Sequence, residues 1–171
     1  MRIEAAALED SRAIAEVHVA SWQQAYADVV PSEYLANLSV QARETSWQEA
    51  IRAGTPTVLV ARYEATVIGF VAFGPSRDED AAANCGEIWA LYVLSPTWST
   101  GVGRSLWLAA LEQLRLQGMS GVVTLWVLSA NERGRQFYTA AGFVPQLESE
   151  KEFSLGGVPL KEIRLAFQDV V

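Results

Sequence analysis

The chain has very few of the residues that build disulfides and metal sites. Among its 171 residues there is one cysteine, Cys85, and one histidine, His18. A single cysteine excludes an intramolecular disulfide, and one cysteine with one histidine offers no cluster of metal ligands. We therefore expect no metal centre, a small apolar role for Cys85 and a position for His18 on the flank of a helix.

Long apolar runs and basic runs are missing too. No run approaches the ~18 apolar residues of a membrane-crossing helix, and the start of the chain has no signal-peptide pattern. There are 13 Lys and Arg against 20 Asp and Glu, so the net charge is −7. Nucleic-acid binding needs a basic face, so we expect neither a nucleic-acid nor a membrane partner. We expect a cytoplasmic protein whose surplus acids mainly keep it in solution, with mild attraction for a cationic substrate.

What is present is the pattern of one globular α/β domain over residues 1–171. Half of the residues are apolar and 19% are charged, which is typical of a folded domain. Periodicity predicts strands at 2–7, 57–62, 66–73, 87–94, 122–127, 148–155 and 160–167, and helices at 11–26, from 31, and at 40–53, 101–117 and 131–141. We expect a mixed central sheet with antiparallel N-terminal strands, a parallel βαβ centre and helices on both faces.

A glycine loop, Gly101-Val102-Gly103, lies between the strand at 87–94 and the next helix. Backbone N–H groups at a helix N-terminus bind phosphate oxygens, and glycines let the main chain approach them. A dinucleotide-binding loop would need a third glycine where Leu106 stands, and an acid after the next strand, where Val127-Leu128-Ser129 stands. A Walker loop would need Gly-Lys-Ser/Thr. The loop therefore predicts a phosphorylated cofactor of another kind.

A second motif follows the next strand. Asn131, Tyr138 and Gly142-Phe143 form the pattern Asn-x6-Tyr-x3-Gly-Phe. With the glycine loop before it, this order resembles the GCN5-related N-acetyltransferase (GNAT) superfamily, whose loop reads Gln/Arg-x-x-Gly-x-Gly/Ala. The chain departs from that pattern at Trp98, where Gln or Arg is usual.

The resemblance implies an enzyme that transfers acetyl from acetyl-CoA, its co-substrate, to a primary amine within a ternary complex. The acceptor would be a small molecule or a peptide, and the family is often dimeric, so a homodimer is one expected state. The cofactor-binding residues that it implies are Leu91, Tyr92 and Val93 on the central strand, Ser99, Thr100, Gly101, Val102, Gly103, Arg104 and Ser105 at the loop, and Asn131 and Gly134 after it.

Two catalytic residues are expected. The resemblance places Tyr138 near the sulfur of acyl-CoA as a general acid, and a phenol of pKa about 10 can protonate a departing thiolate. Since Phe137 precedes it, we expect one of the two rings to face away from the core, with Phe137 packed on the sheet. Glu87 opens the central strand and is either the general base that deprotonates the amine, directly or through a water, or an exposed strand-end glutamate.

Several roles have competing explanations at this stage. Asn131 is a good helix N-cap as well as a candidate pantetheine contact. Trp22 and Tyr26, one helical turn apart, line the acceptor cleft or belong to the core. The acidic loop Asp78-Glu79-Asp80 steers a cationic amine or is merely solvated. The main alternative to an enzyme is a catalytically silent CoA-binding sensor or regulatory module.

Overall fold

The computed structural model describes residues 1–168, which form one seven-stranded sheet in the order β1-β2-β3-β4-β5-β7-β6. Only β4 and β5 are parallel; every other neighbouring pair is antiparallel. The strands are β1 (Arg2–Ala5), β2 (Thr57–Tyr63), β3 (Thr66–Pro75), β4 (Gly86–Val93), β5 (Val122–Leu128), β6 (Val144–Leu155) and β7 (Val158–Gln168). The helices are α1 (Ser11–Ala25), α2 (Ser32–Ala36), α3 (Val40–Ala53), α4 (Val102–Leu116) and α5 (Glu132–Ala140), with short 3-10 turns η1 (Leu8–Asp10) and η2 (Ser95–Thr97). The expected fold class is confirmed.

Strand boundaries differ from the sequence prediction by one or two residues, and by four residues at the start of β6. β1 ends at Ala5 rather than at residue 7, because the N–H of Ala7 donates to the carboxylate of Asp10 at 2.9 Å and the chain turns there into η1. β6 begins at Val144 rather than at residue 148. Its register against β7 breaks between Gln146 and Lys151, and this irregularity hides the first half of the strand from a period-two pattern.

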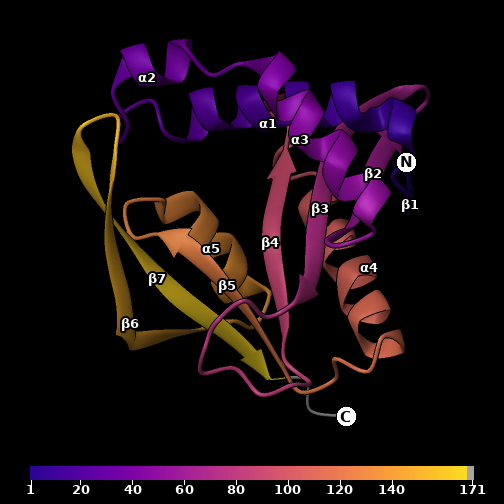
Figure 1. Ribbon diagram of the computed structural model, residues 1–171, viewed down its shortest axis with the longest axis vertical. Coiled ribbons are helices and arrows are strands. Elements are labelled where there is room, and N and C mark those ends of the chain that lie inside the picture. Colours follow the sequence, from indigo (N-terminus) through magenta and orange to yellow (C-terminus); the bar gives the residue numbers. More distant parts are fainter. Residues whose placement is uncertain (169–171) are drawn as a thin grey trace.

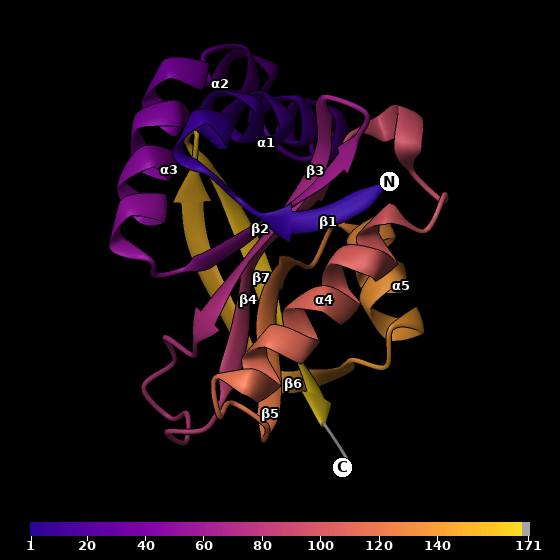
Figure 2. The same ribbon diagram turned by 90° about the vertical axis from the view of Figure 1, so that its right-hand side faces the viewer.

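The helices form a layer on each face of the sheet (Figures 1 and 2), with α1, α2 and α3 on one side and α4 and α5 on the other. On the first face, Ile14 of α1 is fully buried and packs with Val60 and Phe70 of β2 and β3. On the second, Leu106 and Leu114 of α4 are fully buried in the larger core cluster. The burial of both layers holds the central strands β4 and β5 in place.

Within residues 1–168, no helix is both long and apolar enough to span a membrane. In the same residues, no three His, Cys, Asp or Glu side chains gather into a group that could hold a metal ion.

Candidate functional site

The two parallel strands at the centre of the sheet separate soon after they begin. β4 and β5 pair only between Gly86–Ile88 and Val123–Leu125. Further along, β4 stays paired with β3 and β5 with β7, while the strands diverge (Figure 1). Backbone N–H and C=O groups on the facing edges of 89–93 and 126–128 therefore have no partner strand across the gap. An extended ligand with amide groups fits such an edge.

A cavity of about 1000 Å³ occupies this gap. It is lined by α1 from one face of the sheet and by α4 and α5 from the other, so it joins both faces. The residues expected from the sequence that line it are Trp22, Tyr26, Glu87, Leu91, Tyr92, Val93, Ser99, Gly101, Gly103, Arg104, Asn131, Gly134 and Tyr138. The expected residues Thr100, Val102 and Ser105 are not among the lining residues. The Val102 side chain lies in the core instead, and the Thr100 hydroxyl donates to the carbonyl of Thr97 at 2.6 Å.

The glycine loop presents the N-terminus of α4 to the cavity. Ser99 has φ 62° and Gly101 has φ 90°, a left-handed turn that brings the chain into the helix. The first intrahelical bond runs from the N–H of Ser105 to the carbonyl of Gly101 at 2.9 Å, which leaves the earlier amides for a ligand. Gly103 has a further role, because a Cβ there would lie 3.3 Å from the ring of Phe137. A bulky residue at 103 would therefore disturb the packing of α5 as well as any ligand.

Trp98, which departs from the family's loop pattern, is fixed to the main chain. Its indole N–H donates to the carbonyl of Val93 at 2.7 Å. Arg133 of α5 lies with its guanidinium carbon 4.0 Å from the Trp98 ring centroid, and its Nη2 donates to the Ser99 hydroxyl at 3.5 Å. A cation therefore stands beside the loop although the loop itself lacks the usual polar side chain. Sequence reasoning missed Arg133; an arginine two residues after Asn131 was the available signal.

The sequence predicts that one of the adjacent rings of Phe137 and Tyr138 faces away from the core, but neither does. Both Phe137 and Tyr138 pack against the main core cluster. The Tyr138 ring centroid lies 5.1 Å from that of Phe137 and 5.6 Å from that of Phe143. Its hydroxyl makes no hydrogen bond to any residue in 1–168, and the side chain lines the cavity. Burial raises the pKa of the phenol above its ordinary value, so it stays protonated at neutral pH.

Asn131 and Gly134 form one structural unit. The Asn131 Oδ1 accepts the N–H of Gly134 at 2.9 Å, which caps α5, and its Nδ2 donates to the hydroxyl of Tyr26 at 3.4 Å. A Cβ at position 134 would lie only 2.7 Å from that Nδ2. The cap itself therefore requires the glycine, a reason that sequence analysis did not supply.

Trp22 and Tyr26, at the C-terminal end of α1, pack in a core cluster and also line the cavity. Trp22 donates its indole N–H to the hydroxyl of Tyr92 at 2.9 Å and meets Tyr26 edge to face, with centroids 5.0 Å apart. His18 stacks on Tyr92 at 5.0 Å and accepts the indole N–H of Trp47 at 3.2 Å. Desolvation, with a smaller repulsion from Arg43, lowers the pKa of His18 to about 3. The histidine is therefore neutral at ordinary pH and acts as a packing residue.

Glu87 is not the exposed strand-end glutamate that was one alternative, since it is 1% exposed. Its carboxylate accepts the backbone N–H of Arg77 at 2.8 Å and also bonds the guanidinium through Nε and Nη2. The same guanidinium lies 4.3 Å from the ring centroid of Trp89. Glu87 lines the cavity, but Arg77 occupies both of its carboxylate oxygens.

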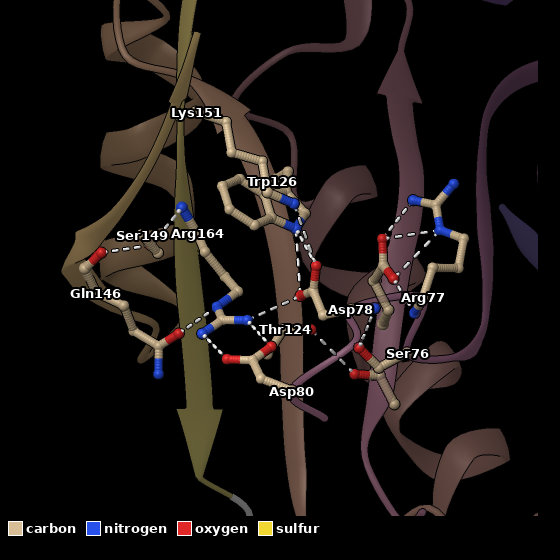
Figure 3. A network of polar contacts seen from close by, with 12 residues as sticks. Ser76, Arg77, Asp78, Asp80, Thr124, Trp126, Gln146, Ser149, Lys151 and Arg164 are labelled. Atoms are coloured by element: carbon tan, nitrogen blue, oxygen red, sulfur yellow. Dashed lines mark hydrogen bonds and ion pairs between the residues drawn. The ribbon is translucent and has the colours of Figure 1, made fainter. Parts of the chain in front are cut away.

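Two acids of the 76–85 loop, Asp78 and Asp80, are paired rather than free (Figure 3). Asp78 accepts the indole N–H of Trp126 at 3.0 Å and contacts Arg164 at 3.1 Å and Lys151 at 3.5 Å. Asp80 accepts two bonds from Arg164, which lower the pKa of its carboxyl. Two of the three acids that we expected to attract a cationic amine are therefore neutralised within the chain, which weakens the steering hypothesis.

Two polar groups at the cavity have no partner. The hydroxyl of Ser21 on α1 is buried without a hydrogen bond among residues 1–168. Glu162 on β7 is half-buried and lines the cavity, and its carboxylate makes no hydrogen bond or ion pair to the described residues. Desolvation raises the pKa of Glu162 above its ordinary value. Sequence analysis missed Glu162, although a glutamate two residues from buried Leu160, on the same strand face, was a usable signal.

Known proteins resemble this chain in sequence and in fold. The family model described as "Acetyltransferase (GNAT) family" matches residues 15–143. An uncharacterized N-acetyltransferase of Bacillus subtilis (strain 168), YuaI, is 36% identical over 169 residues, which cover 98% of this chain and 93% of the relative.

Two solved structures show the same fold at lower sequence identity. The PaiA N-acetyltransferase from Thermoplasma acidophilum, in complex with coenzyme A, has a TM-score of 0.76 at 22% identity, covering 98% of this chain and 99% of the other. The putative acetyltransferase yncA from Salmonella typhimurium, with acetyl-CoA, has a TM-score of 0.74 at 20% identity, covering 100% and 95%. The cavity brings together the loop, the open strand edge, and Asn131 and Tyr138 of the second motif. The family model and the Bacillus subtilis relative show that the chain belongs to the acetyltransferase (GNAT) family.

Proposed function

We propose that the protein transfers an acetyl group from acetyl-CoA to a primary amine that attacks the thioester directly. The observation that carries this proposal is the Tyr138 hydroxyl, which has no partner in residues 1–168 and lines the same cavity as the N-terminus of α4 and the open edge of β4. The PaiA and yncA structures, which hold coenzyme A and acetyl-CoA, support the choice of cofactor.

The residues of the cavity fit that cofactor. In the proposal, the amides of Val102, Gly103 and Arg104 bind the pyrophosphate, because their N–H groups begin α4 and the helix dipole favours an anion there. Arg133 adds a cation beside them. The open edge of β4 around Leu91–Val93 pairs with the amides of the pantetheine arm. A Cβ built at Gly101 would meet no atom within 4 Å, so the loop leaves room for the phosphates.

The chemistry needs one nucleophile, one leaving group and two proton transfers. Acetyl-CoA supplies an acyl carbon activated as a thioester. The amine nitrogen uses its lone pair to form the C–N bond, and the C–S bond breaks with its electrons going to sulfur. The Tyr138 phenol donates its proton to that sulfur and recovers one from the nitrogen as the amide forms. The raised pKa of the phenol keeps the acid loaded before each turnover.

Glu87 has a different role in this proposal from the one that the sequence suggested. A base must have a free oxygen for the incoming proton, whereas both oxygens of Glu87 already accept bonds from Arg77. Protonation would break a buried ion pair. We propose that Glu87 fixes Arg77 and the start of the 76–85 loop at the wall of the cavity, and that another group receives the proton of the amine.

Binding and turnover are tested separately. At 100 times its dissociation constant, acetyl-CoA should add about 2.7 kcal/mol to the free energy of unfolding, which raises the melting temperature by roughly 5 to 10 °C. A panel of primary amines should then release free thiol from acetyl-CoA. An unshifted melting curve at saturating acetyl-CoA contradicts the proposal, and a shift without thiol release from any amine indicates the silent sensor.

A further inference from the structure

We propose that Glu162 binds the ammonium group of the acceptor and accepts the proton that this group loses before attack. The inference rests on the proposed acetyl transfer and names a residue and an acceptor class for it. The structural basis is a half-buried carboxylate that lines the reaction cavity without a partner in the described part of the chain.

Glu162 lies on the face of the sheet from which an acceptor can reach the gap. Alternation along β7 places Leu160 and Glu162 on one face and Ile163 on the other. Leu160 packs with Tyr26, which directly follows α1, whereas Ile163 packs in the cluster under α4. Across the sheet, Glu162 is opposite Leu128 of β5, at the open end of the gap. The acceptor would therefore enter on the α1 side, while the phosphate loop belongs to the α4 side.

Three acids line the cavity, and only Glu162 of the three is free among residues 1–168. Asp78 bonds Trp126, Arg164 and Lys151. Glu87 is held by Arg77. An ammonium entering the cavity therefore finds one carboxylate with both oxygens available, and that carboxylate gains a charge-assisted hydrogen bond on binding.

The charges around Glu162 come from three elements. Lys151 on β6 and Arg77 in the 76–85 loop stabilise its anionic form, whereas desolvation, Asp78 and Glu87 destabilise it, with desolvation the largest effect. Both cations are engaged elsewhere. Lys151, which is opposite Glu162 in the β6–β7 register, lies 3.7 Å from the ring centroid of Trp126, and Arg77 is bound to Glu87. A cationic ligand would supply the missing compensation.

Part of the cavity wall is apolar, although Arg77, Asp78 and Lys151 also line it. Trp126, Phe153 and Leu155 line the same cavity. We therefore assign the acceptor to primary amines that carry the ammonium on an apolar stem. Proton transfer is balanced: the ammonium becomes a neutral amine, Glu162 becomes a carboxylic acid, and the acid later releases its proton to solvent. The raised pKa of Glu162 brings it closer to that of the amine and eases the transfer.

The test uses E162Q with 2-phenylethylamine as acceptor probe, at saturating acetyl-CoA and from pH 6 to 10. We expect KM for the amine to rise about tenfold to hundredfold, as for a lost bond to a charged group, while KM for acetyl-CoA stays unchanged. The kcat of E162Q should fall at neutral pH and recover at high pH, where the amine is already deprotonated. Glu162→Asp, which keeps the charge, should restore part of the affinity.

E152Q is the matched control. Glu152 is exposed on β6 of the same hairpin, opposite Lys161, and does not line the cavity. E152Q removes the same charge as E162Q but at a site outside the cavity, so the KM and pH profile of E152Q should match those of the wild type. The melting temperature of E162Q without ligands should equal or exceed that of the wild type, since an unpartnered carboxylate is removed.

The experiment distinguishes a failure of the proposed acetyl transfer from a failure of the role of Glu162. A wild type that neither binds acetyl-CoA nor releases thiol contradicts the proposed function. An active wild type whose E162Q variant keeps its KM and pH profile overturns the role of Glu162. Preference for phenylalanine over 2-phenylethylamine, or rejection of 2-phenylethylamine by an enzyme that acetylates other amines, overturns the assigned acceptor class.

Discussion

Arg133 and Trp98 lie stacked at the wall of the cavity, with the guanidinium carbon 4.0 Å from the ring centroid. The two residues are far apart in sequence and come from α5 and from the turn before α4. The indole is held at both ends, since its N–H donates to the Val93 carbonyl and its ring supports the cation. A cationic side chain of α5 therefore lies beside Trp98, where the family's loop pattern has Gln or Arg.

Replacing Arg133 by Gln should weaken coenzyme A binding by about tenfold or more, because a charged partner of the phosphates is lost. The salt dependence of the affinity should weaken with it. Isothermal titration measures both. Pantetheine, which has no phosphate, should bind the variant as it binds the wild type. Arg135→Gln is the control, since Arg135 points to the carbonyl of Ser129 and does not line the cavity. Equal losses for coenzyme A and pantetheine would contradict a phosphate contact.

Replacing Tyr138 by Phe should lower kcat by about 10² to 10⁴ and leave the affinity for coenzyme A nearly unchanged. The ring keeps its contacts with Phe137 and Phe143, and the lost hydroxyl has no partner among residues 1–168 to leave unsatisfied. Folding should therefore be unaffected. Steady-state kinetics with melting curves checks this, and Tyr63→Phe, at an exposed tyrosine, is the control. Wild-type kcat across pH would leave Tyr138 as packing alone.

The sequence predicts the helices and strands well, but it does not predict which polar side chains bind one another. Caps, turns and alternation are local, so every α-helix and strand was found, with strand boundaries off by one or two residues and by four at the start of β6. The loop and the Asn-Tyr-Gly-Phe motif lead to the cavity because the parallel β4–α4–β5 unit places both beside the same gap. The pairing of Glu87 with Arg77 and the isolation of Glu162 depend on loop conformation and on strand register. Those are set by tertiary packing, which no local pattern encodes.

Asn131 and Gly134 should behave as a coupled pair in stability. Asn131→Ala removes the cap of α5 and should cost about 1 kcal/mol of unfolding free energy. In a Gly134→Ala background the same change should cost almost nothing, because the new Cβ has already displaced the Asn131 side chain. Urea unfolding of the two single variants and the double variant measures the coupling. Additive losses would mean that the cap adapts to the extra carbon.

Removing Arg77 should lower the free energy of unfolding more than removing the charge of Glu87. Arg77→Ala leaves a buried carboxylate without its cation and should cost about 3 to 5 kcal/mol. Glu87→Gln leaves behind a guanidinium that is 54% exposed and can reach water, so it should cost about 1 to 2 kcal/mol. Chemical denaturation gives both values. The kcat profile of Glu87→Gln should also run parallel to that of the wild type from pH 6 to 10. A loss of kcat at neutral pH that recovers at high pH would return the base role to Glu87.

His18 should make stability depend on acid pH. Its folded-state pKa is lowered from 6.5 to about 3, so the unfolded chain binds the proton more readily between these values. The contribution of His18 is complete above pH 6.5 and is lost as pH falls toward 3, by about 1.4 kcal/mol per pH unit. His18→Phe keeps a ring against Tyr92 and removes the titration. The difference in unfolding free energy between wild type and variant should be constant above pH 7 and shift against the wild type below pH 6. Parallel curves from pH 7 to 4 would mean that His18 is hydrated and protonated within the fold.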